Sequence, residues 1–429
     1  MADIDVAGVD ITDPAHYGSG VPHELFHALR DAGAVHRHRT TRTVTGEPFE
    51  FWSVVRHGEI QHVNRDWQTF SATDGPGLVP TEVERRGQMI VSMDPPDHSR
   101  LRKLISAGFT PRMVSELEGS MVRWTARILD DVSERGECDF VRDVAYQLPM
   151  HVIADIVGIP ESDRPWVFHH AETMLKGLDP RSGLSREDRA ASERELFLYA
   201  QSLGREKRAN PTDDVWTVLS SAEIVGDDGT ATELTDFELD LFFLILTLAG
   251  SETTRNAISQ GLVALLDHPD QVRMLRDDRS LLHSATDEMI RWASPVLFFG
   301  RTATCDVVLG GAHISEGDRV VMWYPSGNRD ESAFVDPFRF DITRHPNPHV
   351  SFGGGGPHYC LGASLAKKEV QVMFGALLDR FSEIELSGTA QWAGAGPAHN
   401  VGASLDQLPV RLHAGVGARP STSSPWRDN

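Results

Sequence analysis

The segment from Thr235 to Leu266 constrains the fold of this chain most, because it runs for about thirty residues without a proline. Thr235 and Glu238 form the capping-box pattern, in which each side chain bonds a free amide at the start of a helix. A helix of that length spans roughly 45 Å, enough to cross a whole domain. The run Leu241–Gly250 is apolar except for Thr247, and it is only about half as long as a helix that spans a bilayer. The sequence therefore predicts a long helix buried at the centre of a core.

Helical periods dominate from Pro95 to about Leu266 and return after it. The predicted helices are Pro22–Ala34, Pro111–Gly136, Val141–Gly158, Glu161–Leu178, Arg186–Arg208, Pro269–Asp277, Leu281–Trp292 and Gly362–Phe381, and one that starts at His57. Stretches at Phe49–Val55 and Arg319–Trp323 are typical of strands, and Ser71–Val91 is typical of a long irregular loop. We therefore expect a mainly α fold with a minor β portion concentrated towards the C-terminal half.

The chain has 429 residues, which is large for one ordinary domain, yet no internal repeat and no long linker divides it. Its 40% hydrophobic and 24% charged residues exclude a disordered chain. We expect a single large domain over residues 1–413. Residues 414–429 are rich in Ser, Pro and Gly and are predicted to be a disordered tail.

The charge balance and the cysteines narrow the class of protein. Lys and Arg number 41 against 62 Asp and Glu, a net charge of −21, which disfavours binding to nucleic-acid backbones. Cys138, Cys305 and Cys360 stand far apart, which excludes a disulfide scaffold and a multi-cysteine metal site and suits a reducing compartment. The acidic N-terminus has no signal-peptide pattern, so we expect a cytoplasmic protein.

The segment from Phe352 to Gly362 combines four consecutive glycines, Cys360 and the start of a predicted helix. A helix N-terminus carries roughly half a positive charge and free amides, which together stabilise a cysteine thiolate. The glycines let the backbone approach a flat or bulky group closely. A phosphate-binding loop would be followed by Lys-Ser/Thr, which this segment lacks. The pattern favours a thiolate ligand, with a structural buried cysteine as the alternative.

Two further motifs contain charged residues, one in the middle of the apolar helix and one as a pair on a later helix. The run Ala249–Thr254 puts Glu252 and Thr253 in the middle of the apolar helix, where an unpaired charge is costly. A solvated face or a simple kink is the alternative to a functional role. Glu288 and Arg291 lie about one helical turn apart, a spacing that on its own is typical of a surface salt bridge.

In this order and at these separations, the three motifs resemble the cytochrome P450 family, whose signature is an acid–alcohol pair in a long helix, then ExxR, then a cysteine-containing haem loop. The resemblance covers about residues 8–413 and includes Asp94–Arg102, Phe299–Ala303 and Asn328–Phe340. It implies a cytochrome P450 fold and a haem b cofactor, whose iron inserts one oxygen atom from O2 into a C–H bond. Phe352 lies one residue further from Cys360 than is usual in the family, a variation that some bacterial members share.

The resemblance also implies roles for individual residues. Cys360 would be the thiolate ligand of the iron, while Thr253 would hydrogen-bond oxygen and Glu252 would relay protons. The other residues expected at the haem are His98, Arg102, Ala249, Arg301, Phe352, His358 and Gly362, with both His and both Arg at the propionates. Glu288, Arg291 and Arg339 would form a structural network that braces the haem-side scaffold.

The substrate pocket is expected to be apolar, although each candidate residue could equally belong to the core. The candidates are Leu78, Val79, Met89, Ile90, Met174, Leu246, Val296, Leu297, Phe298 and Phe299. Residues 20–38, 322–331 and 345–366 resemble bacterial members that hydroxylate sterol side chains or methyl-branched lipids, which favours such a substrate. The alternative is natural-product tailoring of a polyketide, a terpenoid or an aminoacyl group on a carrier protein. A haem-thiolate sensor without turnover is the candidate from another class.

An electron donor is also implied, because the sequence contains no flavin or iron–sulfur motif. Ferredoxin and ferredoxin reductase are the expected partners. Basic residues gather near Cys360 and could form either a docking surface for an acidic ferredoxin or a solvated face. They are Arg100, Arg102, Lys103, Arg112, Lys367 and Lys368.

Overall fold

The computed structural model describes residues 6, 8–43, 46–106, 111–177, 182–225, 231–393 and 403–415, with the backbone alone at 111–114, 224–225 and 231. Over these residues the chain is mainly helical with several small sheets, which confirms the expected fold class. The last strand reaches Ala414. The predicted disordered tail lies outside the described residues from position 416 on.

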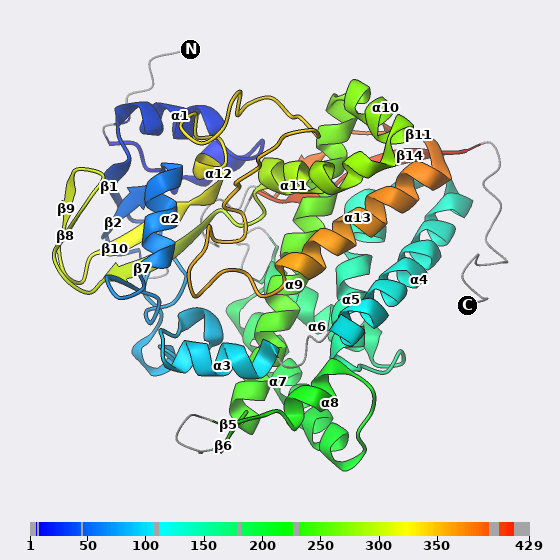
Figure 1. Cartoon of the computed structure of the whole chain (residues 1–429), viewed down its shortest axis with the longest axis horizontal. Coiled ribbons are helices and arrows are strands. Elements are labelled where there is room, and N and C mark those ends of the chain that lie inside the picture. The colour runs from blue at the N-terminus through cyan, green and yellow to red at the C-terminus, as the bar shows by residue number, and fades with distance from the viewer. Residues whose placement is uncertain are drawn as a thin grey trace.

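Helix α9, Asp236–Asp267, has 32 residues and runs through the middle of the helical part in Figure 1. Its capping box is present, because Thr235 Oγ1 accepts a hydrogen bond from the amide of Glu238 and Glu238 Oε2 accepts one from the amide of Thr235. Helices α5, α7, α11 and α13 pack against it, so apolar side chains are buried along most of its length. The predicted central helix is thereby confirmed.

The other helices follow the predicted bounds to within a few residues wherever bounds were predicted. They are α1 His23–Ala32, α2 His57–Arg65, α3 Asp97–Ser106, α4 Pro111–Arg135, α5 Gln147–Val157, α6 Arg164–Lys176, α7 Arg186–Ala209, α8 Val215–Ser220, α10 Pro269–Asp277, α11 Leu282–Ala293, α12 Tyr324–Gly327 and α13 Ala363–Arg380. Short helical turns are η1 Pro14–Tyr17, η2 Val83–Arg85, η3 Ile90–Ser92, the π-helical η4 Val141–Ala145 and η5 Arg279–Leu281. The segment predicted as one helix from Val141 therefore divides into η4 and α5.

The main sheet lies on the opposite side of the molecule from most helices, next to α1 and α2 (Figure 1). Its strand order is β1-β2-β10-β7-β3, in which β10 runs parallel to β2 and the other neighbours are antiparallel. The strands are β1 Val35–Thr40, β2 Phe49–Val54, β3 Phe70–Ser71, β7 Phe298–Ala303 and β10 Arg319–Trp323. The expectation of β structure concentrated towards the C-terminus is thus incomplete, because this sheet takes three strands from the first 71 residues.

Four smaller sheets complete the β structure of the described residues. One has the order β11-β14-β4, and the others are two-stranded. Their strands are β4 Glu137–Asp139, β5 Glu223–Val225, β6 Ala231–Glu233, β8 Val307–Leu309, β9 Ala312–Ile314, β11 Phe381–Leu386, β12 Gln391–Trp392, β13 Leu405–Gln407 and β14 Pro409–Ala414. No helix in the part of the chain that the structure describes is long and apolar enough to cross a membrane.

Candidate active site

Cys360 stands at the end of a glycine-rich loop, just before α13. Residues 353–356 of this loop all have positive φ, and a Cβ on Gly356 would lie 2.2 Å from the carbonyl oxygen of Asn64 in α2. Only glycine fits such a position. The amide of Cys360 donates to the carbonyl of Phe352 at 3.0 Å, so the loop holds Cys360 in place even with its extra residue.

The Cys360 side chain is exposed, yet its thiol lies within the protein envelope, which means that it faces an interior space. Burial raises the pKa of the thiol above its ordinary value, while the amide of Gly362 and the charge of Arg102 act in the opposite direction. A thiolate here therefore needs further positive charge beside it. A metal ion bound to the sulfur supplies that charge.

On α9, Ala249 is exposed although the helix around it is largely buried. Thr253 is half-buried one turn later, and its Oγ1 donates to the carbonyl of Ala249 at 2.7 Å. Gly250 backs onto Ile153 of α5, where a Cβ would lie 2.9 Å from the Ile153 Cδ1 atom. The face of α9 that carries Ala249 and Thr253 therefore opens onto an interior space.

Glu252 is buried and forms an ion pair with Arg255, one turn further along α9. The Nε atom of Arg255 is buried and has no hydrogen-bond partner among the described residues. Successive side chains on an α-helix point about 100° apart, so Glu252 and Thr253 leave α9 in different directions. The structure therefore pairs the Glu252 carboxylate with Arg255 and not with Thr253.

Four basic side chains gather between α3, β7 and the glycine-rich loop. The rings of His98 and His358 have centroids 4.2 Å apart, and Arg301 is 2% exposed. Burial, followed by the charges of Arg102 and Arg301, lowers the pKa of His98 to about 4. Burial, Arg301 and His98 lower the pKa of His358 to about 2. Both imidazoles are therefore neutral near pH 7, and the positive charge of the cluster comes from Arg102 and the buried Arg301.

Little negative charge is available to this cluster from the protein itself. The nearby Asp94 already accepts hydrogen bonds from Ser71 Oγ and from the amide of Ala72. The Nε2 atom of His358 is buried and has no hydrogen-bond partner among the described residues. A cavity of about 430 Å³ lies alongside, lined by His98, Ser99, Arg102, Lys103, Ser106, Gly356 and Pro357. An anion in this region would meet donors that are otherwise unsatisfied.

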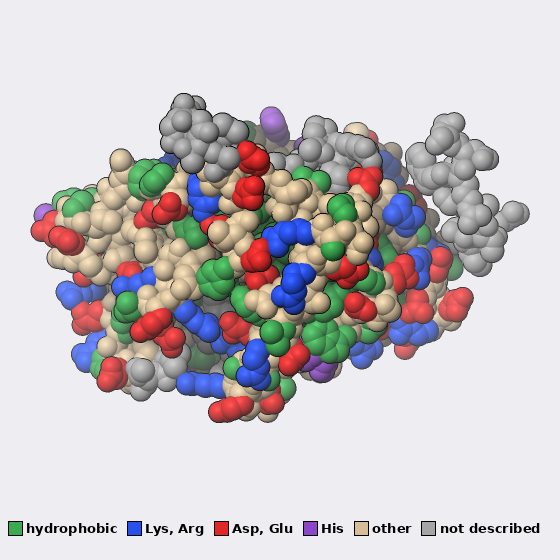
Figure 2. All heavy atoms as spheres, turned by 90° about the horizontal axis from the view of Figure 1, so that it is seen from below, with side chains coloured by type: hydrophobic (Ala, Val, Ile, Leu, Met, Phe, Trp, Pro, Cys, Tyr) green, Lys and Arg blue, Asp and Glu red, His purple; other side chains and the backbone are tan. Residues whose placement is uncertain are grey.

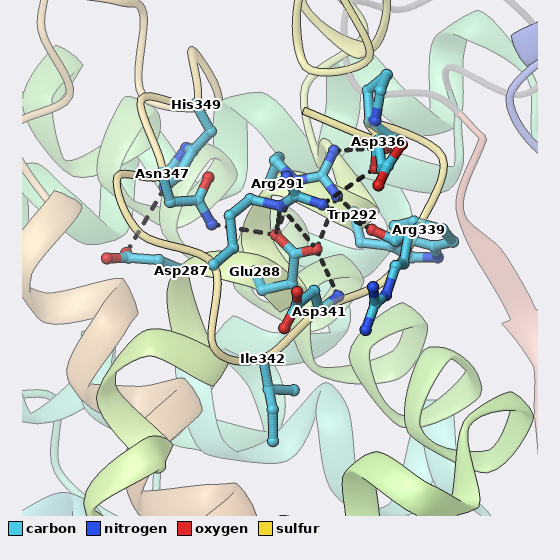
Figure 3. A network of polar contacts seen from close by, with 12 residues as sticks. Asp287, Glu288, Arg291, Trp292, Asp336, Arg339, Asp341, Ile342, Asn347 and His349 are labelled. Atoms are coloured by element: carbon cyan, nitrogen blue, oxygen red, sulfur yellow. Dashed lines mark hydrogen bonds and ion pairs between the residues drawn. The ribbon is translucent and has the colours of Figure 1, made fainter. Parts of the chain in front are cut away.

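Figure 3 shows a second polar cluster, centred on Glu288 of α11. Glu288 and Arg291 are fully buried and paired through two hydrogen bonds of 2.7 Å. Arg291 Nη1 also donates to the carbonyls of Asn328 and Pro337. The amide of Asp341 and the side chain of Asn347 donate to the Glu288 carboxylate. The predicted ExxR pair is therefore a deeply buried link between α11 and the loop after α12.

The prediction that the Arg339 side chain joins this network is wrong in its detail. Arg344 supplies the second guanidinium, with its Nε 3.2 Å from Glu288 Oε2. Arg339 is exposed, and it contributes its backbone carbonyl, which accepts hydrogen bonds from Arg291 and Arg344. Sequence reasoning missed Arg344 and Asn347, because only the path of the 330–350 loop decides which side chain turns inwards.

The residues predicted to line the substrate pocket separate into two groups. Leu297 and Phe298 are 0% and 1% exposed and pack in the core beneath the main sheet with Trp323, while Met174 and Leu78 are also buried in core clusters. The half-buried candidates are Met89, Ile90, Leu246, Val296 and Phe299, and Val79 is exposed. The second group keeps apolar surface open to a ligand.

The predicted basic cluster is largely paired within the protein. Arg100 forms an ion pair with Glu238, Lys367 with Asp287 at 2.6 Å and Lys368 with Glu118 at 3.2 Å. Arg102 and Lys103 line the 430 Å³ cavity next to the glycine-rich loop. The side chain of Arg112 lies outside the described residues. The basic character near Cys360 therefore rests mainly on Arg102 and Lys103.

A thiol in an interior space, an open face on a central helix, and a group of two arginines and two histidines with an unpartnered nitrogen define a haem-thiolate type of site. The cytochrome P450 family model matches residues 199–393. Cytochrome P450 126 of Mycobacterium tuberculosis is 41% identical over 423 residues, which cover 96% of this chain and 99% of the relative. The chain belongs to the cytochrome P450 family.

Other relatives carry names that describe a reaction. Steroid C26-monooxygenase of Mycobacterium tuberculosis is 38% identical over 388 residues, covering 88% of this chain and 87% of the relative. Methyl-branched lipid omega-hydroxylase of Mycobacterium bovis is 36% identical over 340 residues, 78% of each chain. The solved structure of Mycobacterium marinum cytochrome P450 CYP268A2 in complex with pseudoionone has a TM-score of 0.85 and 37% identity, covering 94% and 99% of the two chains.

Family membership makes this protein a haem-dependent monooxygenase that uses O2 and a hydrophobic substrate. The residues present fit haem b in two respects. The free, exposed Cys360 side chain at the end of the glycine-rich loop is a ligand that haem iron accepts, and Arg102, Arg301 and the unpartnered His358 Nε2 can bond carboxylates. The iron and the two propionates of haem b provide both.

Proposed function

We propose that this enzyme hydroxylates a C–H bond of a sterol or a methyl-branched lipid. The observation that carries the proposal is the open face of α9 at Ala249 and Thr253, together with half-buried apolar residues such as Leu246, Val296 and Phe299. Such a lining excludes water and favours an apolar substrate. The names of two relatives, a steroid C26-monooxygenase and a methyl-branched lipid omega-hydroxylase, support this substrate class.

In this proposal, Cys360 ligates the iron, and His98, Arg102, Arg301 and His358 bond the propionates. The bound haem supplies the oxidation of the C–H bond. Charge-assisted hydrogen bonds from Arg102 and Arg301, together with hydrogen bonds from the two histidines, would fix the orientation of the cofactor. Three further residues hold the cofactor by contact. Ala249 contributes its small side chain, Phe352 its ring and Gly362 its backbone.

Thr253 and Glu252 control protons in this scheme. The hydroxyl hydrogen of Thr253 is engaged by the carbonyl of Ala249, so its oxygen is left to accept a hydrogen bond from a water molecule at the reaction site. Glu252 alternates between its ion pair with Arg255 and the Thr253 side, and in doing so carries protons inwards.

Thr253→Ala should let O2 consumption exceed product formation, whereas Thr253→Ser should retain coupling. Unchanged coupling in Thr253→Ala would remove this role from Thr253.

The thiolate assignment is tested by the carbon-monoxide difference spectrum of the reduced protein. Wild type should show the red-shifted Soret band that thiolate ligation produces, and Cys360→Ser should lose it. Cys138→Ser is a matched control, because burial raises the pKa of that thiol to about 12 and keeps it inert. Persistence of the band in Cys360→Ser would eliminate Cys360 as the ligand.

The substrate class is tested by spin-state titration against sterols, methyl-branched lipids and polyketides, followed by turnover with a reductase system. We expect the largest spectral shifts and a hydroxylated product from the sterols or branched lipids. Shifts produced by polyketides or by carrier-bound aminoacyl groups alone would favour natural-product tailoring. Binding without O2 consumption or product would indicate a sensor.

For electron delivery we propose an acidic ferredoxin that binds beside the glycine-rich loop. Figure 2 shows acidic and basic side chains interspersed on one face of the molecule, so the net charge of −21 does not form a continuous acidic surface there. Lys103 borders the cavity next to the loop, whereas Lys368 is already paired with Glu118. Lys103→Gln should slow reduction by ferredoxin at low salt more than Lys368→Gln does. Equal rates would argue against this surface.

A further inference from the structure

Arg319 is a buried arginine of β10 whose partners lie mainly in the loop between β3 and α3. Its side chain is 3% exposed. Nε donates to the carbonyl of Leu78 at 3.3 Å, and Nη2 donates to the carbonyls of Gly75 and Gly77. Nη1 donates to Thr302 Oγ1 on the neighbouring strand β7 at 3.1 Å. One guanidinium group therefore fixes three carbonyls of the loop against the main sheet.

The backbone of the loop also bonds the sheet directly beside Arg319. The amide of Gly300 in β7 donates to the carbonyl of Pro76 at 2.8 Å. A Cβ on Gly300 would collide with Arg319 Nη2 and with the carbonyl oxygen of Gly77. Only glycine leaves room for so close an approach of loop, strand and guanidinium group.

Further contacts extend from this anchored half of the loop to its second half. Asp74 accepts a hydrogen bond from Thr302 Oγ1 at 2.7 Å and pairs with Arg86 at 2.9 Å. The amide of Gly87 donates to the carbonyl of Thr73 at 3.3 Å. The position of the second half of the loop therefore depends on the anchored half.

The second half of the loop lies beside residues that fit haem. Met89 and Ile90 are half-buried, and Ile90 packs against the main core cluster, as Leu246 of α9 also does. The η3 turn contacts α3, and the backbone of Met93 hydrogen-bonds the ring of His358. A displacement of this half of the loop would therefore change the apolar lining near the haem site.

We propose that Arg319 is a positioning residue for substrate binding, which sets the place of Met89 and Ile90 by holding the loop backbone against the main sheet. This inference rests on the proposed function, because it takes these two side chains as part of the pocket lining. A guanidinium group suits the task, because its planar donors reach several carbonyl oxygens at once and its charge strengthens each hydrogen bond.

The test measures how tightly the haem-loaded full-length enzyme binds imidazole and clotrimazole, from the shift of the Soret band. Imidazole only ligates the iron, whereas the aryl groups of clotrimazole also fill the apolar space around it. Arg319→Ala should weaken clotrimazole binding by roughly 10-fold, or about 1.4 kcal/mol, and leave imidazole binding unchanged. Arg319→Lys should retain only part of the affinity, because an ammonium group lacks the planar fork that bonds several carbonyls.

Chemical rescue separates the role of the guanidinium group from general damage to the fold. Millimolar guanidinium chloride should restore clotrimazole binding in Arg319→Ala, because the free ion fits the space that the side chain leaves. Urea at the same concentration has a similar shape without the charge and should not restore it.

Arg30→Ala is the matched control for the loss of a buried arginine. Arg30 is 2% exposed, but it bonds Ser326 and Glu331 and not the loop. Arg30→Ala should lower the midpoint of urea unfolding without changing the affinity for clotrimazole. An equal loss of clotrimazole affinity in Arg30→Ala would reduce Arg319 to a general contributor to stability and overturn the proposal.

Hydrogen exchange tests whether the effect passes through the loop. The amides of Thr81 and Gly87 bond carbonyls within the loop and should exchange faster in Arg319→Ala than in wild type. The amide of Asp341 bonds Glu288 and should keep its wild-type rate. Unchanged exchange in the loop, or equal loss of imidazole and clotrimazole binding, would overturn the proposal.

A failure of this inference differs from a failure of the proposed function. The two azoles and the exchange rates report on Arg319 even if neither cholesterol nor a methyl-branched fatty acid shifts the spin state, a result that would refute only the substrate class. If these lipids bind wild type and Arg319→Ala equally well, the substrate class stands and the positioning role fails. The carbon-monoxide band verifies the fold and haem content of each variant, and Arg319→Lys replaces Arg319→Ala if the latter does not fold.

Discussion

Two buried polar clusters of this molecule differ in whether their polar groups find partners within the described part of the chain. Around Glu288, the carboxylate accepts hydrogen bonds from Arg291, Arg344, Asn347 and the amide of Asp341. Around His358, buried cationic and imidazole groups face one another, and the His358 Nε2 atom lacks a partner within the described part of the chain. Both clusters border the segment that leads to Cys360.

The difference separates scaffold from binding site. A buried ion pair whose hydrogen bonds are complete stabilises only its own geometry, and removal of one partner leaves an uncompensated charge. A buried group of basic side chains that lacks hydrogen-bond acceptors is stable only when a bound group supplies those acceptors. The Glu288 cluster should therefore respond to mutation through folding stability, and the His358 cluster through cofactor affinity.

Glu288→Ala should have the largest effect. It leaves Arg291 and Arg344 without their carboxylate, and breaking a buried pair in this way costs about 3–5 kcal/mol of unfolding free energy. Urea unfolding followed by circular dichroism measures the loss. Glu118→Ala, which removes the exposed partner of Lys368, is the control and should leave the midpoint unchanged. A loss below about 1 kcal/mol for Glu288→Ala would mean that the network is not a scaffold.

Arg344→Leu and Arg339→Leu form a matched pair within the same loop. Arg344 donates to Glu288 and to the carbonyls of Val335, Asp336 and Arg339, whereas the Arg339 side chain is exposed. We expect Arg344→Leu to cost about 2–3 kcal/mol and Arg339→Leu to have no measurable effect. The same urea experiment measures both variants. The reverse order would restore the original prediction for Arg339.

This pair also shows where sequence reasoning stops. The family resemblance implied that Arg339 joins Glu288 and Arg291, but Arg344 lies only five residues further along the same loop and has the same residue type. Which one turns inwards depends on the tertiary path of the loop. The α9 helix was predictable because its capping box at Thr235 and its apolar run are local features.

Strands and pocket residues illustrate the same limit. β1, with the sequence VHRHRT, is an edge strand of the main sheet. Most of its residues are polar, so it lacks the alternation of apolar and polar residues by which a strand is predicted. Leu297 and Phe298 are apolar, and their composition alone cannot separate a core position from a pocket position. Cys360 stood out in the sequence because it lies beside four glycines and a predicted helix start, which favoured a thiolate ligand over a structural cysteine.

Arg301→Gln changes the His358 cluster and should lower haem affinity without lowering the folding stability of the apoprotein. It removes a buried cation, so the apoprotein should be no less stable than wild type, while haem is lost more readily because a propionate donor is gone. The expected loss is about 1.5–3 kcal/mol, or roughly 10- to 100-fold in haem affinity. The rate of haem transfer to an acceptor apoprotein measures it. Destabilised apoprotein with unchanged haem transfer would place Arg301 in the scaffold class.

Asn347→Ala should give the smallest effect and tests whether the Glu288 cluster is as complete as its contacts indicate. Asn347 Nδ2 donates to Glu288 Oε2 at 3.1 Å, and its loss leaves the carboxylate with its other donors. We expect a loss of about 1 kcal/mol at pH 7, measured by urea unfolding. A loss as large as that of Glu288→Ala would show that the network depends on every member.

The cost of Asn347→Ala should also depend on pH. Burial alone would raise the pKa of Glu288, but the hydrogen bonds and charge of Arg291 and the amide of Asp341 lower it below the ordinary value. Because the folded-state pKa is depressed, the stability that the carboxylate contributes is present above the unfolded-state pKa of about 4.3 and is lost as the pH falls through the folded value. Asn347 bonds the charged form, so the difference between variant and wild type should shrink in that acidic window. A difference that stays constant down to the acid transition would mean that Asn347 acts through packing and not through the charge of Glu288.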